Sequence, residues 1–424
     1  MPILANFPVL GSDIQKLTRD VIVTCDDIHT CRTIGQILQT CFTVASLCTW
    51  VTLHPNVPPR RLPPSSRLGW CWHQIPWEEI PMIFLALIAP EAIFALALRQ
   101  YGAARYFHQT HELSMTHGFF IVMGGFVTKD GNHPITTTSL ATQYKSSIEA
   151  VRDEEIADKS KSDLLAKALT VVQLFFFIGV YGVRVKEGLQ ISALETSTLG
   201  LAVIQCLTGF FWLKKPQRVG QAIAIDFGHP SCPESKSTSD DTPNQNSERG
   251  QNDTTTLPGP FQSGGHTNQA ESWCLTAVRK ALNGAMFGRY DFDPMAASCV
   301  PRFWSGDIEH NLHLFWQLLC AVLLGGVHLL AWSTKSTFFP SFIEMWLWRI
   351  CALILAASPI LCVLLLLIKN CFNTGSDSLR ALFACLPYGI AALYLIARAT
   401  LLILSFTTLR GAPTGILIDV NWRF

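Results

Sequence analysis

Two stretches near the end of the sequence decide the fold class: LILAASPILCVLLLLI (353–368) and GIAALYLIARATLLIL (389–404). The first contains no charged residue, and the second contains only Arg398. A helix needs about 20 mainly apolar residues to cross the hydrocarbon layer of a membrane, which is roughly 30 Å thick. With their flanking residues both stretches reach that length, so they predict membrane-spanning helices at about Ile350–Ile368 and Leu382–Phe406.

The rest of the sequence has the same character. Of its 424 residues, 49% are hydrophobic and only 15% are charged, whereas soluble domains carry about a quarter charged residues. The formal net charge of +1 offers no global basic surface for nucleic acid. We therefore expect an all-α, polytopic transmembrane helical bundle of about seven spans, that is, a multi-pass integral membrane protein in contact with membrane lipid. The five further spans are predicted at Thr33–Leu53, Ile80–Leu98, Leu165–Val183, Ile191–Leu213 and Leu312–Trp332.

These spans divide the chain into five parts. They are an amino-terminal polar segment (1–32), four spans with a long polar loop at 99–166 (33–213), a second polar loop (214–311), three spans (312–406) and a tail (407–424). Within the second loop, residues from about 228 to 270 are rich in Ser, Thr, Asn, Gly and Pro, a composition typical of disorder. Residues from about 272 to 290 place apolar side chains at helical spacing beside Arg279 and Lys280, which predicts an amphipathic helix on the membrane surface. The apolar stretch His117–Val127 is too short to span, so we expect a re-entrant, interfacial or packed segment there.

The charges near the span ends predict an orientation. With seven spans, the amino terminus lies on the same side of the membrane as both long loops, and that side carries the larger number of Lys and Arg residues. The positive-inside rule therefore predicts a cytoplasmic amino terminus. A glycosylation sequon at Asn252 falls on the same side, and we interpret it as a chance match in a tract rich in Asn and Thr. Cys25 and Cys31 could pair if that side is oxidising. Nothing in the sequence indicates which membrane holds the protein.

Several segments carry a resemblance, in chain order: IHTCRTIGQILQTCFTVASLCTWVTLHPNVP (Ile28–Pro58), APEAIFALALRQ (Ala89–Gln100), MTHGFFIVMGGF (Met115–Phe126), IADKSKSD (Ile156–Asp163), ISALE (Ile191–Glu195) and FWLKKPQ (Phe211–Gln217). Together they resemble an uncharacterised family of fungal multi-pass membrane proteins, well over roughly Ile28–Val219 and loosely over the carboxy-terminal spans. The resemblance implies a fungal source and a membrane location. It implies no activity and assigns no functional residue.

Glu91 is the foremost candidate for a functional residue. It lies near the middle of the second predicted span, directly after Pro90. An acid at that depth is costly, so intramembrane carboxyl groups are functional candidates by default, and a protonated one suits a proton relay or a general acid. The structural alternative is a neutral Glu91 hydrogen-bonded to a backbone carbonyl that Pro90 leaves free.

Glu195 and Arg398 are the other candidates. Glu195 lies near the start of the fourth predicted span, and Arg398 lies about two-thirds along the seventh. Either side chain could extend to the membrane surface. Arg398 lies deeper than a long side chain easily reaches, which predicts a partner such as Glu91 or Glu195.

Metal and cofactor chemistry is not indicated. The histidines of YFHQTHELSMTH (106–117), and a second group of Glu309, His310 and His313, have spacings that could hold a metal. We interpret them as interfacial or capping residues and predict no metal and no cofactor. The sequence contains no Gly-rich phosphate loop and no GxSxG elbow.

The sequence leaves three function classes open, and whether the protein is an enzyme stays undecided. A transporter, receptor or other membrane-embedded binding protein predicts that Glu91 and Arg398 face a polar cavity open to one side. An enzyme acting on a lipid or isoprenoid predicts a closed apolar pocket with Glu91 or Glu195 at its floor. A scaffold predicts packed spans without a cavity. Protein partners are not indicated.

Overall fold

The structure is a computed structural model of the whole chain. It describes residues 31–59, 79–130, 132–161, 164–226, 292–306, 312–332, 337, 339–371 and 377–420. The predicted disordered tract at 228–270, the predicted amphipathic helix at 272–290, Cys25 and Asn252 all lie outside these residues.

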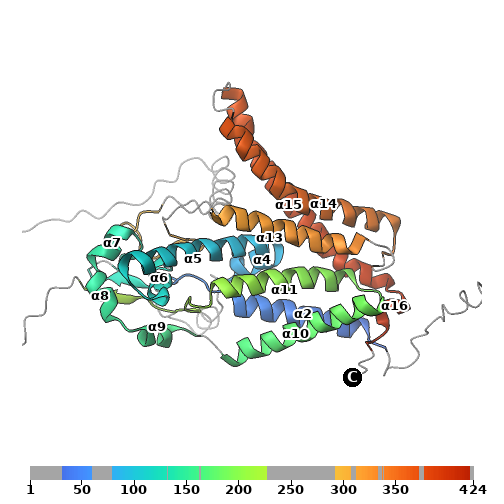
Figure 1. Cartoon of the computed structure of the whole chain (residues 1–424), viewed down its shortest axis with the longest axis horizontal. Helices are drawn as coiled ribbons and strands as arrows, with labels where there is room; N and C mark the ends of the chain where they lie inside the picture. The colour runs from blue at the N-terminus through green and yellow to red at the C-terminus, as the bar shows by residue number, and fades with distance from the viewer. Residues whose placement is uncertain are drawn as a thin grey trace, which may run out of the picture.

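The described chain is dominated by long helices that lie side by side (Figure 1). Five of them are long and apolar enough to cross a membrane, which agrees with the predicted helical fold class but not with the number of seven spans. A helix rises 1.5 Å per residue, so the 19 residues of α11 cover about 28 Å. The long helices are α2 (Ile34–Thr52), α5 (Pro90–His111), α10 (Leu164–Glu187), α11 (Ala193–Phe211), α13 (Leu312–Leu329, continued by the 3-10 turn η2 at Leu330–Trp332), α14 (Phe342–Cys371) and α15 (Asp377–Thr407).

Local capping signals define where two of these helices begin. At the start of α2, the Thr33 side chain accepts a hydrogen bond from the Gln36 backbone, and the Gln36 side chain binds the Thr33 N–H in return. Ser192 and Glu195 form the same reciprocal capping box at the start of α11. Such boxes satisfy backbone donors that the first turn of a helix leaves free. The predicted bounds of these two spans are therefore correct to within two residues.

The helical bundle has two ends that hydrogen bonds identify. At the tail end, the backbone N–H of Arg32 donates to Leu417 at 2.7 Å, and a bridge joins Ile191 to Thr337. At the opposite end, the Gln217 side chain donates to the Val51 carbonyl at 3.0 Å. This second end carries a small subdomain and is called the subdomain end below. Accordingly α2, α11 and α14 run away from the tail end, and α10, α13 and α15 run toward it.

The prediction that Ile80–Leu98 forms one helix that crosses the bundle is wrong. The segment Ile80–Leu98 is divided between α4 (Ile80–Ile88) and α5, which meet at Ala89 with a bend of 114°. A new helix begins at Pro90, because proline fits the first helical position, where its missing N–H costs nothing. Glu79, just before α4, pairs with Arg218 at the subdomain end. His111, the last residue of α5, binds Thr142 in the subdomain, so both ends of the pair lie at the same end of the bundle.

This geometry corrects a second expectation. Because α4 and α5 enter and return at one end, the chain crosses the bundle once, not twice, between residue 32 and the loop at 112–161. The start of α2 therefore lies at the tail end, whereas that loop forms the subdomain at the other end (Figure 1). Residue 32 and the first long loop therefore lie at opposite ends of the bundle.

The subdomain has its own apolar core. It contains α6 (Met115–Val122), α7 (Thr138–Gln143), α8 (Lys145–Ala150), α9 (Asp153–Lys159) and a parallel pair of short strands, β1 (Phe126–Thr128) and β2 (Ile223–Ile225). The predicted segment His117–Val127 is fully buried here, as a packed helix and strand. The charged stretch before α10 belongs to the predicted polar loop at 99–166. In it, α9 ends at Lys159 and an extended link at Ser160 precedes α10.

A buried polar cluster fastens the subdomain end together. The Lys215 ammonium donates to the His54 carbonyl, to Asn56 Oδ1 at 3.2 Å and to Gln100 Oε1 at 2.8 Å. The indole N–H of Trp212 donates to the same Gln100 oxygen at 3.0 Å. Burial lowers the pKa of Lys215 well below its usual value, because no charged partner among the described residues offsets the lost hydration. The cluster joins α2, α5 and α11 through neutral oxygens.

The tail segment, residues 412–420, is held at the other end by two arginines. Arg184 Nη1 donates to the Ile418 carbonyl at 2.6 Å, and its Nη2 donates to Ile416 at 3.0 Å. Arg32 Nε donates to the same Ile416 carbonyl at 2.9 Å. The neighbouring Cys31 bridges to Ile418 and is disulfide-bonded, with its partner outside the described side chains. The short helix α16 (Thr414–Leu417) is thereby fixed against α2 and α10.

Candidate functional site: an apolar cavity with a buried arginine

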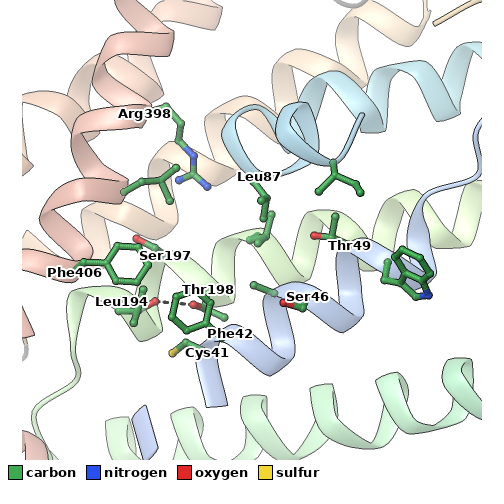
Figure 2. A pocket seen from close by; sticks show the side chains of 15 residues that line it. Cys41, Phe42, Ser46, Thr49, Leu87, Leu194, Ser197, Thr198, Arg398 and Phe406 are labelled. Atoms are coloured by element: carbon green, nitrogen blue, oxygen red, sulfur yellow. Dashed lines mark hydrogen bonds between the residues drawn. The ribbon is translucent and has the colours of Figure 1, made fainter. Parts of the chain in front are cut away.

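A cavity of about 500 Å³ lies between α2, α4, α11 and α15. Known small-molecule sites measure about 300–1,000 Å³. Figure 2 shows side chains from these helices converging on the space. Most lining atoms are apolar, and the lining residues are Cys41, Phe42, Ala45, Ser46, Thr49, Trp50, Ile83, Leu87, Leu194, Ser197, Thr198, Leu201, Arg398, Leu402 and Phe406.

The break between α4 and α5 helps to create this cavity. Since α4 ends at Ile88, Leu87 is the last α4 residue that lines the space. Phe42 of α2 and Phe406 of α15 stack with their ring centroids 5.7 Å apart and bridge the two helices on one side. Phe42 is 54% exposed and Trp50 48% exposed, so the rim of the cavity reaches the apolar outer surface of the bundle.

Arg398 is the one charged residue among the described residues that line the cavity. It lies on α15 and is 1% exposed. Its Nε donates to the Ile88 carbonyl at 3.2 Å. That carbonyl belongs to the last turn of α4, where backbone acceptors have no partner within the helix. The reversal at Ala89 therefore supplies the acceptor that positions the guanidinium group.

His328 of α13 provides the second contact. Its Nδ1 lies 2.7 Å from the Leu324 carbonyl, which requires a proton on Nδ1. The other ring nitrogen, Nε2, then accepts from Arg398 Nη1 at 2.8 Å, so the imidazole is neutral. The indole N–H of Trp348 donates to the His328 carbonyl at 3.1 Å and holds the residue in place. In the described part of the chain, no ion pair joins Arg398 to a carboxylate.

A pair of hydroxyl groups extends this network. Ser405 donates to the Leu401 carbonyl at 2.8 Å, and Ser197 lies 2.7 Å from the Ser405 oxygen. Ser197 is also 3.4 Å from His328 Nε2 and lines the cavity. The Thr49 hydroxyl, on the α2 wall, is buried and has no hydrogen-bond partner. The cavity thus presents a few polar groups within an apolar surface.

Glu91 lies beside this site but does not line the cavity. It is 4% exposed and occupies the first turn of α5, where the helix dipole favours a negative charge. Its carboxyl group interacts electrostatically with Arg398, and the Tyr394 hydroxyl lies next to it, beyond hydrogen-bond geometry. Both Glu91 Oε2 and the Tyr394 hydroxyl lack a hydrogen-bond partner. Of the candidates chosen from the sequence, Glu91 and Arg398 lie near each other and interact electrostatically, but no hydrogen bond or ion pair joins them among the described contacts.

Glu195 has a different place. It forms a bidentate pair with Arg32, with oxygen–nitrogen distances of 2.5 and 3.0 Å. It also accepts from the Ser192 backbone at 2.9 Å and from the Ser192 hydroxyl at 2.8 Å. All these contacts lie at the tail end, where Glu195 caps α11. The expected partnership of Arg398 with Glu195 is therefore absent among the described contacts.

The histidines of the sequence motif at 106–117 serve the subdomain. His108 Nδ1 contacts the Leu113 carbonyl at 2.5 Å, and His111 binds the Thr142 hydroxyl. His117 contacts Asp153 at 2.9 Å and the Val151 carbonyl at 2.7 Å. The second histidine group lies outside the described side chains. Within the described residues, no three potential ligands cluster around one point.

Sequence reasoning missed His328 and the serine pair. His328 is a polar residue within an otherwise apolar predicted span, and Ser197 lies in the fourth predicted span. Both could have been chosen as candidate site residues, as Arg398 was, because each is a polar residue deep within an apolar predicted span. Their contact with one another depends on how three helices pack, which spacing along the chain does not reveal.

Comparisons with known proteins add one finding. Residues 107–230 match a family of unknown function (DUF8562), which covers less than a third of the chain. The match runs from the end of α5 through the subdomain and α11. No curated protein and no solved structure matches the chain. The chain is therefore similar to an uncharacterised family over this region, and the fungal source stays a prediction.

Proposed function

We propose that the protein is a multi-pass membrane protein that binds an amphiphilic, membrane-soluble ligand in the cavity between α2, α4, α11 and α15. The observation that carries this proposal is the apolar cavity with one buried charged group. Ligand sites in proteins combine a mainly apolar lining with a few polar groups that orient the ligand.

Membrane embedding is supported by what the helices expose. On α10, the side chains of Leu165, Val172 and Phe175 are each at least two-thirds exposed. Such a surface is unfavourable in water and suits contact with acyl chains. The five apolar helices of sufficient length support the same conclusion.

We further propose that the subdomain end faces the cytoplasm. Lys and Arg residues near the helix ends are more numerous there than at the tail end, which favours this side under the positive-inside rule. The disulfide at Cys31 supports an oxidising compartment at the tail end. This reverses the orientation expected from seven spans, because the α4–α5 pair returns to its own side. The described basic residues near the helix ends include Lys129, Lys145, Arg152, Lys159, Lys161, Lys214, Lys215, Arg218 and Arg302 at the subdomain end, and Arg32, Arg184, Lys186, Arg349 and Arg410 at the tail end.

Protease protection tests the orientation. A cleavage site inserted after Asp130 should be cut by protease added to sealed vesicles whose cytoplasmic face is outward. A site inserted after Pro413 should be protected until the vesicles are opened with detergent. The reverse pattern would refute the orientation.

The cavity favours a binding protein over the other two classes. A scaffold does not need an internal space of this size. The enzyme hypothesis expected Glu91 or Glu195 at the cavity floor, and neither is among the described lining residues. The transporter and receptor hypotheses expected a polar cavity, whereas this one is apolar apart from Arg398 and a few hydroxyl groups. Whether ligand binding serves transport or signalling is not decided by the geometry.

Photolabelling tests the binding function. The probe is a neutral hexadecanol that carries a diazirine and an alkyne on its chain, incubated with the purified protein in detergent micelles. Wild-type protein should be labelled on peptides from α2, α11 or α15 that line the cavity. Ala45→Phe should fill the cavity and reduce this labelling severalfold, whereas Val172→Phe, a matched change on the exposed face of α10, should leave it unchanged. Equal labelling of the two variants would refute the proposal.

A second candidate function rests on Glu91. Its buried, unpartnered carboxyl oxygen beside Arg398 suits a group that takes up or releases a proton. Glu91→Gln keeps the shape and removes the titrating group. A normal phenotype of this variant, in a strain where deletion of the protein has one, would exclude every function that depends on a proton at Glu91.

A further inference from the structure

We propose that the polar end of the ligand is a carboxylate, bound by the guanidinium group of Arg398, and that its tail is a single apolar chain. This inference rests on the proposed ligand-binding function of the cavity and names the class of ligand. It follows from the charge balance at Arg398, the free donor that faces the cavity and the size of the space.

The first argument is the missing counter-charge. Arg398 is 1% exposed, and its two hydrogen-bond partners, the Ile88 carbonyl and His328 Nε2, are neutral. A buried charge is costly unless a partner of opposite charge compensates it. Glu91 is the nearest described acid, but no ion pair joins it to Arg398. An anionic ligand would supply the directly bonded counter-charge that Glu91 does not supply to the guanidinium group.

The second argument is the direction in which the guanidinium group of Arg398 points. Of the guanidinium nitrogens, Nε and Nη1 are occupied by Ile88 and His328. No hydrogen bond to another described residue is formed by Nη2. Figure 2 shows the Arg398 side chain extending from α15 with its guanidinium group toward the space between Leu87 and Ser197. An anion in the cavity would therefore meet a free charged donor, and the Ser197 hydroxyl lies on the same wall.

The third argument is the amount of charge and the volume. Arg398 is the sole cation among the described lining residues, so the site balances one negative charge. A phosphate monoester carries about −1.5 to −2 at neutral pH and would need further donors. A carboxylate carries one charge and pairs with a guanidinium group in a charge-assisted hydrogen bond. The volume of about 500 Å³ suits one chain and not a phospholipid with two.

The lining also suggests where the chain leaves the cavity. Phe42 and Phe406 lie at the side of the space that approaches the exposed surface of the bundle. Phe42 and Trp50 are both about half-exposed and would lie among the acyl chains of the membrane. A ligand could thus place its head at Arg398 and its tail between α2 and α15, so that it enters from the membrane and not from water.

Matched photoprobes test this inference. The three probes carry the same sixteen-carbon diazirine–alkyne chain and end in a carboxylate, an alcohol or a phosphate. Wild-type protein should bind the carboxylate at least about tenfold more tightly than the alcohol, since only the carboxylate can form a hydrogen bond with Arg398 in which both partners are charged. Arg398→Gln should remove that preference and still capture the alcohol, which also shows that the variant is folded. Arg398→Lys should keep part of the preference.

The outcomes separate the two proposals. Equal capture of carboxylate and alcohol by wild-type protein, a measurement that needs no variant, would overturn the carboxylate inference and leave the binding function standing. Stronger capture of the phosphate would overturn it as well. A carboxylate preference that persists in Arg398→Gln would remove Arg398 from the site. Failure of all three probes to label residues that line the cavity would refute the binding function itself.

Discussion

Replacing Arg32 by methionine should destabilise the protein strongly, because the substitution leaves the Glu195 carboxylate buried without its counterion. The two side chains are only 12% and 6% exposed and are joined by hydrogen bonds of 2.5 and 3.0 Å. Removing one partner of a buried ion pair costs about 3–5 kcal/mol. Loss of the Arg32 bond to the Ile416 carbonyl adds about 1 kcal/mol. Arg184 lies close enough to offset part of this cost, so we expect a total of about 3–5 kcal/mol.

A double-mutant cycle isolates the pair. Glu195→Gln retains an oxygen for the Ser192 cap but leaves Arg32 without a negative partner. The double variant Arg32→Met/Glu195→Gln contains no unpaired charge, so it should cost about 2 kcal/mol less than the sum of the two single variants. Arg410→Met is the matched control. Arg410 pairs with Glu344 but is 64% exposed, and such surface pairs contribute about 0–1 kcal/mol.

The free energies can be measured by equilibrium unfolding in dodecyl maltoside micelles with increasing fractions of SDS, followed by tryptophan fluorescence. If the single costs add to within about 0.5 kcal/mol, or if Arg32→Met costs no more than Arg410→Met, the pair does not hold the fold. Glu195 would then be free to act as a functional acid, as the sequence left open.

Three further predictions concern other parts of the molecule. Burial lowers the pKa of His54 from 6.5 to about 3, so the unfolded state binds more protons between these values and stability should fall as the pH drops below about 6.5. His54 alone should account for a loss of about 2 kcal/mol at pH 5 relative to pH 8, and His54→Gln should reduce the pH dependence by that amount in the same unfolding assay. Gly325→Ala should lower the free energy of unfolding by about 1–3 kcal/mol, since a Cβ there would lie 2.5 Å from the Ala356 backbone nitrogen. Gly326→Ala, whose Cβ would have no atom within 4 Å, should raise it by about 0.5–1 kcal/mol. Equal effects of the two variants would contradict the packing of α13 on α14. Arg184→Met should release the tail segment and speed its cleavage in limited proteolysis, and unchanged cleavage would show that Arg32 alone retains it.

Much of the helical architecture could be predicted from the sequence, because apolar runs of sufficient length have few alternatives in water. The predicted bounds of α2 and α11 agree with the structure, in which capping residues fix the start of each helix. The segment Ile80–Leu98 was misread, since an apolar run does not distinguish a helix that crosses from a pair that turns back. The misreading then placed the start of α2 on the same side as the loop at 112–161, whereas the two lie at opposite ends of the bundle.

The candidate site was only partly predictable, for a related reason. Arg398 and Glu91 stood out because charged groups are expensive in an apolar span. The role of Glu195 could not be inferred from its own span, because its partner Arg32 is 163 residues away. His328 and Ile88, which position Arg398, are separated from it by 70 and 310 residues. Contacts of this kind depend on helix packing, and neither composition nor periodicity carries that information.

The arginine clamp on the tail segment has a consequence for how the protein is made. Arg32 binds the Ile416 carbonyl, 384 residues further along the chain. While the chain is being synthesised, α2 is therefore complete long before the carbonyl groups of Ile416 and Ile418 exist, and so is Arg184, the other residue that binds them. The tail end of the bundle closes only after residues 416–418 have left the ribosome and reached the same side. Until then Arg32 and Arg184 lack the backbone acceptors that the tail segment supplies.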